Sequence, residues 1–146
     1  MEVLFEDMKD KNFEILGRSG YRSFHTQRSI FNSNARKHGE EYANRFSAYP
    51  GQSEHQTGLA MDVTNSKVNF RLSDSFGKTE EGIWLKENAH NYGFIIRYPE
   101  EKEHITEYIY EPWHLRYLGE ELAIFLYEHN ITLEEFYDPD FIIDYD

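Results

Sequence analysis

The chain has 146 residues and a net charge of −12, because its 27 acidic residues outnumber its 15 basic ones. This length fits a single domain, residues 1–146, and 39% hydrophobic residues are enough to fill a core. The negative charge argues against nucleic acid and against an anionic membrane surface as partners. The absence of cysteine excludes disulfides and a thiol nucleophile, and no apolar run approaches the ~20 residues that span a bilayer.

The first third of the chain predicts helices separated by one short strand. Residues 2–11 place Val3, Leu4 and Met8 on one side of a helix. The next elements are a strand through residues 13–15 before the turn at Gly17, a helix over 23–37 that ends at Gly39, a helical piece at 40–45 and a turn at 49–53.

Residues 58–63 alternate between bulky and small side chains, which is typical of a strand with one face in the core. The bulky set is Leu59, Met61 and Val63, and the small set is Gly58, Ala60 and Asp62. A carboxylate inside an apolar strand is costly unless a cation or several donors compensate its charge. The small residues near Asp62, Gly58 and Ala60, leave room for a compensating group beside the sheet.

The rest of the chain predicts two helical regions around further strands. Thr79 caps a helix that reaches Tyr92 and stops at Gly93. The other expected elements are a polar loop at 64–78, a strand at 94–97, extended pieces at 105–110 and 113–117 broken by Pro112, a helix opened by Gly119, a short helix after the capping box at Thr132, and an acidic tail from Asp138. Because helices and strands do not alternate regularly, we expect an α+β fold with a small antiparallel sheet flanked by helices.

Three side chains are candidates for one metal site. His55 precedes Asp62 by seven residues, in a turn that can fold back over the same face of the strand. His114 can join them from a distant strand. Two imidazoles and one carboxylate, with water in the fourth position, are typical of catalytic zinc. Either histidine alone would be interpreted as a surface or core residue, and it is the combination with Asp62 that favours the metal.

Glu111 and Arg22 are candidates for the catalytic side chains outside this ligand set. Glu111 precedes His114 by three residues, a spacing that sends side chains to opposite faces of a regular strand. Pro112 disturbs that regularity, so both side chains can meet at the metal, with Glu111 as the general base for a zinc-bound water. Arg22 is expected to clamp a substrate carboxylate or to steady an oxyanion, and an ion pair with a nearby acid is its alternative.

Four motifs occur in order along the chain. They are Ser-Gly-Tyr-Arg-Ser at 19–23 with Gln27 after it, the segment 50–62 with Ser-Glu-His-Gln-Thr-Gly-Leu-Ala-Met-Asp, Tyr-Gly-Phe-Ile-Ile-Arg-Tyr-Pro at 92–99, and Tyr-Glu-Pro-Trp-His-Leu-Arg-Tyr-Leu-Gly at 110–119. Together they resemble the VanY-like D-alanyl-D-alanine carboxypeptidases, zinc peptidases that trim bacterial peptidoglycan stem peptides. The resemblance covers residues 3–137 and implies the small α+β fold shared by D-Ala-D-Ala peptidases and the hedgehog domain.

The resemblance also implies roles for individual residues. It implies one zinc ion held by His55, Asp62 and His114, and a catalytic carboxylate at Glu111. It implies substrate contacts from Arg22, Gln27 and Ser53. Tyr21 and Trp113 are walls of the substrate cleft or core aromatics, and the sequence does not separate these two interpretations.

The implied function is removal of the C-terminal D-alanine from peptidoglycan stem peptides. An L,D-carboxypeptidase acting on tetrapeptides and a D,D-dipeptidase share the same motifs and stay open. A non-catalytic, zinc-stabilised binding module is a further alternative. A serine hydrolase built on Ser53 is disfavoured, because no Gly-x-Ser-x-Gly segment is present.

The remaining expectations concern basic residues outside the proposed site, the oligomeric state and the location in the cell. Arg97 and Arg116 flank the motifs and are expected to be structural ion-pair partners. The histidines outside the motifs are expected to be surface or core residues: His25, His38, His90, His104 and His129. A monomer is expected. Relatives of this type carry more chain before the first motif, often with an anchor or signal, so we expect a cell-wall location if such a segment precedes the chain and a cytoplasmic one otherwise.

Overall fold

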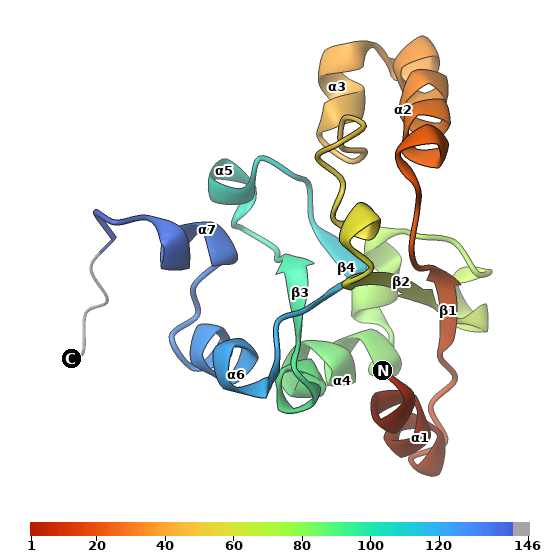
Figure 1. The fold of residues 1–146 in the computed structure, drawn as a ribbon. Coiled ribbons are helices and arrows are strands. Elements are labelled where there is room, and N and C mark those ends of the chain that lie inside the picture. Colours follow the sequence, from red (N-terminus) through yellow and green to blue (C-terminus); the bar gives the residue numbers. More distant parts are fainter. Residues whose placement is uncertain (142–146) are drawn as a thin grey trace.

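A computed structural model of the protein describes residues 1–141 and shows a four-stranded antiparallel sheet surrounded by helices (Figure 1). The strands are β1 (Leu16–Ser19), β2 (Ala60–Thr64), β3 (Phe94–Tyr98) and β4 (Glu111–Tyr117), and their order across the sheet is β1-β2-β4-β3. The expected α+β architecture with a small antiparallel sheet is therefore confirmed.

The helices begin and end largely where the cap residues predict. They are α1 (Glu2–Asp10), α2 (Phe24–His38), α3 (Glu40–Asn44), α4 (Glu80–Asn88), α5 (Glu103–Thr106), α6 (Glu120–Glu128) and α7 (Leu133–Tyr137). Ser23 caps α2 by accepting a hydrogen bond from the backbone N–H of Thr26, and Thr132 forms the predicted capping box with Glu135. Gly93 takes a left-handed conformation, with φ of 78°, after the 3-10 turn Ala89–Tyr92 that extends α4.

Several predicted elements differ from the observed ones. The first strand lies at Leu16–Ser19 instead of 13–15, and residues 105–110 form the end of α5 and a loop instead of an extended piece. Pro112 lies inside β4 and does not precede it. The loop at 64–78 contains the 3-10 turns Ser66–Val68 and Asp74–Lys78.

The two faces of the sheet carry different side chains. Met61 and Val63 of β2 and Leu115 of β4 turn to the hydrophobic core, where they meet buried side chains of α1, α4 and the turn before α4: Leu4, Met8, Phe76 and Leu85. The predicted alternation in β2 is confirmed from Ala60 onward. Leu59 was expected on the core face but is exposed, because β2 begins after it. Of the residues predicted on one side of the first helix, Leu4 and Met8 are buried and Val3 is exposed.

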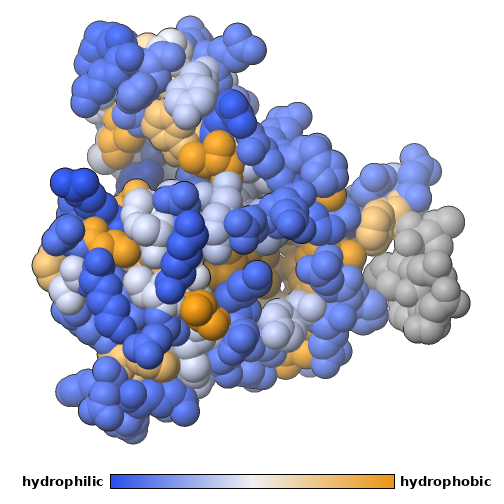
Figure 2. Space-filling model, turned by 180° about the vertical axis from the view of Figure 1, so that it is seen from behind, coloured by the Kyte–Doolittle hydropathy of each residue, from blue (hydrophilic) through white to orange (hydrophobic). Residues whose placement is uncertain are grey.

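The opposite face of the sheet forms the floor of a cleft. Figure 1 shows α2 and α3 standing side by side at one end of the molecule, away from α4 and α6. The cleft lies between the base of this helical pair and the sheet, since residues from both line it. The view from behind in Figure 2 is mostly hydrophilic, with hydrophobic groups scattered over it, as the high charge predicts.

Two further expectations concern the ends and the membrane. Asp138 and Asp140 of the acidic tail are exposed as predicted, and residues 142–146 lie outside the described part of the chain. Within residues 1–141, no helix has both the length and the apolar character needed to traverse a bilayer.

Candidate active site

Three chain segments bring the predicted metal ligands together. Asp62 of β2 pairs directly with His114 of β4, so their side chains stand next to each other on the cleft face of the sheet. His55 comes from the 3-10 turn Glu54–Thr57, which folds back over β2. The backbone holds this turn in place, because the N–H of Arg22 donates to the carbonyl of His55 at 3.1 Å.

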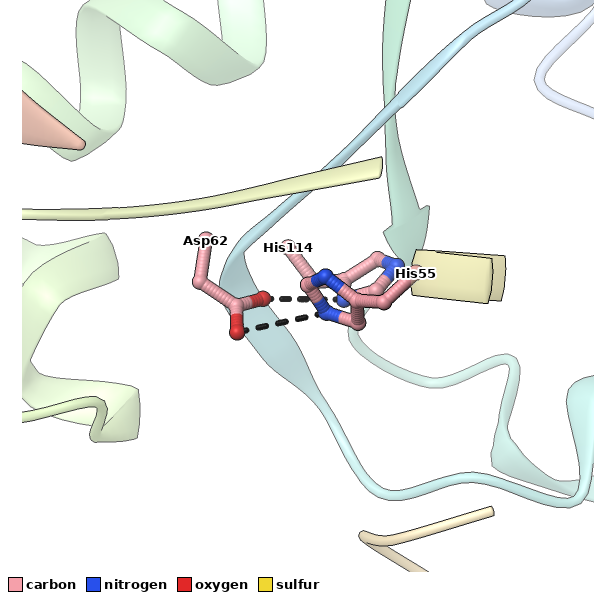
Figure 3. A group of neighbouring side chains, drawn as sticks. All are labelled: His55, Asp62 and His114. Atoms are coloured by element: carbon pink, nitrogen blue, oxygen red, sulfur yellow. Dashed lines mark hydrogen bonds and ion pairs between the residues drawn. The ribbon is translucent and has the colours of Figure 1, made fainter. Parts of the chain in front are cut away.

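The three side chains are buried and point toward one another (Figure 3). Oδ1 of Asp62 lies 3.0 Å from Nδ1 of His114, and Oδ2 lies 3.3 Å from Nε2 of His55. Ligand atoms about 2.0 Å from a tetrahedral zinc ion lie about 3.3 Å apart. One ligand atom from each residue falls within 4.8 Å of the others, so the group fits a single ion.

One hydrogen bond of His55 defines which tautomer the neutral ring adopts. Its Nδ1–H donates to the carbonyl oxygen of Gly20 at 2.7 Å, and a carbonyl can only accept. In the neutral ring, Nε2 therefore carries the lone pair, and this is the nitrogen that faces Asp62. Such outer hydrogen bonds are the usual way in which a metal-ligating histidine is oriented.

Charge is concentrated around Asp62 and His114. Burial would raise the pKa of Asp62, but the interactions with the imidazoles of His114 and His55 outweigh it and hold the pKa below its ordinary value. Burial alone would lower the pKa of His114. The hydrogen bonds with Asp62 and Glu54 have the larger effect and raise this pKa to about 9. The cluster thus favours positive charge at its centre, which is the condition for binding a cation.

Glu111 lies on the same face as His114 despite the odd spacing. Between Ile96 and Tyr98, β3 advances two residues while its partner strand runs from Leu115 back to Glu111, so β4 bulges here. As a result, Oε2 of Glu111 lies 3.9 Å from Nδ1 of His114. Burial raises the pKa of Glu111 to about 8, although His114 and Arg22 counteract it. A carboxyl group whose pKa lies near neutral pH can exchange a proton in either direction there.

Arg22 reaches the cluster from the segment after β1. Its Nη2 donates to Oδ2 of Asp62 at 2.6 Å, and its Nε donates to Oγ of Ser19 at 2.9 Å. Gln27 is buried and donates to the carbonyl of Ala48 at 2.7 Å, while its Oε1 faces Arg22 at 3.4 Å. Both side chains line the cleft, so the guanidinium borders the same space as the His55–Asp62–His114 group.

The cleft has a volume of about 280 Å³ and combines the polar cluster with aromatic and aliphatic walls. Ser53 is buried and lines it. Trp113 also lines it and at the same time packs on the core, so both interpretations of this residue apply. Tyr21 is 70% exposed and is not among the lining residues.

Residues 1–120 match the VanY family, described as D-alanyl-D-alanine carboxypeptidase. The chain belongs to the VanY family. YodJ of Bacillus subtilis is 46% identical over 138 residues, which are 94% of this chain and 50% of that protein. The chain thus spans half the length of this relative.

Solved structures of VanY-like enzymes have the same fold. The LdcB LD-carboxypeptidase matches with a TM-score of 0.88 at 47% identity, over 94% of this chain and 64% of that one. VanYB in complex with D-alanine-D-alanine matches with a TM-score of 0.84 at 33% identity, over 95% of this chain and 78% of that one. A vancomycin-resistance D,D-pentapeptidase VanY in complex with Zn(II) matches with a TM-score of 0.80 at 32% identity, over 92% of this chain and 78% of that one.

The sequence reasoning missed several residues of this VanY-family cleft. Glu54 received no role, yet it contacts His114, and both arginines expected to form ion pairs, Arg97 and Arg116, do so with this carboxylate. Further lining side chains come from loops and from β3: Phe46, Leu72, Tyr98, Tyr108 and Ile109. Only Tyr98 had a signal, its place in the 92–99 motif. The histidines expected to lie elsewhere are not among the lining residues.

Proposed function

We propose that this VanY-family chain is a zinc carboxypeptidase that removes the C-terminal D-alanine from peptidoglycan stem peptides. One observation carries the proposal: the His55–Asp62–His114 group shares a cleft with a second buried carboxylate, Glu111, and with the cation Arg22. Metal-assisted cleavage of a terminal peptide bond uses a polarising metal and a proton carrier, and a cation can anchor the terminal carboxylate.

The metal would be held by His55, Asp62 and His114. The Nε2 atom of His55 and the Nδ1 atom of His114 both face Asp62, and the ligand set leaves room for a fourth position, as in catalytic zinc sites. Zinc bound there supplies a Lewis acid that polarises the scissile carbonyl and lowers the pKa of water to ~7. Support comes from the related VanY structure that contains Zn(II).

Glu111 would carry the proton. Its carboxylate takes a proton from the attacking water and delivers it to the amine that leaves with D-alanine. Its burial in the cleft and its position 3.9 Å from His114 place it next to the metal ligands without its being one of them. The raised pKa of Glu111 keeps the proton available for the second transfer.

Arg22 would bind the terminal carboxylate of the peptide. A guanidinium offers parallel donors that match a carboxylate, and the negative charge of the whole chain makes a local cation necessary for an anionic substrate. Gln27 and Ser53 would complete this end of the cleft, since both line it beside Arg22.

Two stem peptides are candidates. The pentapeptide ending in D-Ala-D-Ala is the first, supported by VanYB in complex with D-alanine-D-alanine. The tetrapeptide, in which D-alanine follows an L-residue, is the second, and it is supported by the LdcB LD-carboxypeptidase and by an L,D-carboxypeptidase DacB of 38% identity. We further propose that residues 1–146 form one domain, act as a monomer and work where peptidoglycan is matured, outside the cytoplasmic membrane.

A substrate comparison tests the proposal. Pentapeptide and tetrapeptide are incubated separately with the zinc-loaded protein, and released D-alanine is measured with a D-amino acid oxidase assay. Release from at least one peptide is expected, and the ratio of the two kcat/KM values assigns D,D or L,D specificity. No release from either peptide, at protein concentrations that bind zinc fully, would contradict the proposal.

A further inference from the structure

The carboxylate of Glu54 lies among three basic side chains. Its Oε1 accepts a hydrogen bond from Nε of Arg97 at 2.7 Å and forms an ion pair with Nη1 of Arg116 at 2.9 Å. Its Oε2 lies 3.4 Å from Nε2 of His114. The Glu54 side chain is only 12% exposed. The two oxygens therefore have separate partners, because Oε1 contacts the two arginines and Oε2 faces the histidine.

The surrounding contacts fix Glu54 in this position. Both Nη atoms of Arg97 donate to Glu134 of α7, at 3.0 Å and 2.5 Å, while its Nε donates to Glu54. Arg97 thus has carboxylate partners on two sides and is largely buried. Arg116 stands on β4 two residues after His114, on the same face of the strand. A carboxylate held by two fixed guanidinium groups cannot easily swing away from the histidine.

His114 needs an acceptor at this location if its inner nitrogen binds a cation. Its Nδ1 faces Asp62 and Glu111, so Nε2 is the ring nitrogen left for an outer partner. The backbone carbonyl oxygen of Gly20 is the corresponding outer acceptor for the ring of His55. Among the described residues, Glu54 is the group with a hydrogen bond to Nε2 of His114. An outer carboxylate fixes the tautomer and orientation of a ligating imidazole and increases its basicity.

We propose that Glu54 is the positioning residue for His114. It holds Nε2 in the protonated state and turns Nδ1 toward the metal, and Arg97 and Arg116 hold Glu54 in place. The same short turn thereby supplies one ligand, His55, and the support of another. This inference rests on the proposed zinc site, and it adds a residue that acts on the metal through His114 and does not touch substrate.

The test uses Glu54→Gln in the full chain, with zinc alone as the ligand. The amide keeps the size of the side chain but removes its charge. The zinc dissociation constant, measured by competition with a chromogenic chelator, is expected to rise 10–100-fold. With Co(II) in place of zinc, the visible absorption spectrum is expected to change, because it reports the geometry of the ligands.

Two control variants separate this role from a general loss of an ion pair. Glu87→Gln makes the same charge change at an exposed site on α4. Glu134→Gln breaks the outer contacts of Arg97 but leaves Glu54 beside His114. Both controls are expected to bind zinc within about twofold of the parent. Glu54→Asp retains a charge for the arginines but draws the carboxylate back from His114, so it is expected to bind zinc at least 10-fold more weakly. It serves as the second test if Glu54→Gln does not fold.

The outcomes distinguish this inference from the proposed function. If the parent protein binds no zinc, the proposed metal site is wrong and the inference falls with it. If the parent binds zinc tightly and a folded Glu54→Gln or Glu54→Asp variant binds it equally well, only the positioning role is overturned. A Glu134→Gln variant that loses as much zinc affinity as Glu54→Gln would also overturn it, because the effect would then belong to Arg97.

Discussion

Glu111 and Arg22 approach the His55–Asp62–His114 group from different segments, β4 and the stretch after β1. Neither belongs to the proposed ligand set, so their removal separates chemistry and substrate binding from metal binding. Asp62 could be found from the sequence because a carboxylate in an apolar strand needs a counter-charge. The role of Glu54 could not, because its three partners come from residues 97, 114 and 116 and meet only in the folded sheet.

Replacing Glu111 with Gln is expected to lower kcat by about 10²–10⁴-fold, the usual contribution of a positioned proton carrier. The neutral amide keeps the size of the side chain but cannot accept the proton. Zinc content is expected to stay near that of the parent. Steady-state kinetics together with metal analysis check both parts. A variant with unchanged kcat would assign the proton transfer to another group.

Replacing Arg22 with Lys keeps the charge but removes the planar pair of donors. We expect kcat/KM for a peptide with a free C-terminal carboxylate to fall about 10–100-fold. For the same peptide with an amidated C-terminus, parent and variant are expected to be equally slow. Measuring the two peptides with both proteins tests the clamp. If kcat/KM of the variant falls by the same factor for both peptides, Arg22 does not recognise the carboxylate.

The element scale shows where local patterns predict structure and where they do not. Thr79 and Thr132 cap helices as predicted, and Ser23, expected as the first residue of a helix, is the N-cap of α2. The bulge of β4 around Pro112 was foreseen only as a disturbance, because its size depends on the pairing with β3. The segment 105–110 was wrongly predicted as extended, since it begins in α5 and continues as a loop in which Tyr108 and Ile109 line the cleft.

Gly82 lets α4 pack tightly on the turn Asp74–Lys78. A Cβ atom at this position would lie 2.1 Å from the carbonyl oxygen of Phe76. Gly82→Ala is therefore expected to lower the free energy of unfolding by about 2 kcal/mol or more, despite the roughly 1 kcal/mol gain in helix propensity. Urea unfolding measures this, with Glu87→Ala on the exposed side of α4 as the control. A stabilised Gly82→Ala variant would contradict the packing.

Glu81 on α4 links this helix to the end of β2. Its carboxylate accepts from Nδ2 of Asn65 at 3.1 Å and pairs with Nζ of Lys67 at 2.9 Å. Burial opposes ionisation, but hydrogen bonds led by Lys67 lower the pKa of Glu81. At pH 7, Glu81→Gln is expected to cost about 1–3 kcal/mol in the free energy of unfolding.

This cost depends on pH in a defined direction. Because the folded pKa of Glu81 is depressed, its contribution is fully present above the unfolded value of about 4.3 and is lost as pH falls through the folded pKa. The difference between parent and Glu81→Gln is therefore expected to shrink toward pH 3 in urea titrations. A difference that stays constant from pH 7 to pH 3 would show that the charge of Glu81 contributes nothing.

The whole molecule brings its chemistry to one face of a small sheet and its core to the other. The alternation in β2 predicted this division from the sequence, with Val63 toward the core and Asp62 toward the cleft. The placement of α2 and α3 over the cleft could not be predicted, because it depends on contacts between distant segments, such as Phe31 with Tyr49. Net charge is a property of the whole chain, and Arg22 places a local cation in the cleft despite it.

The central claim is tested most directly by titrating the metal-free protein with zinc while D-alanine release from a stem peptide is followed. Activity is predicted to be absent at the start and to rise linearly until one zinc ion per chain has been added. The His114→Ala variant is predicted to show no such rise at the same zinc concentrations. Full activity in the metal-free protein, or a plateau that is independent of zinc, would contradict the account.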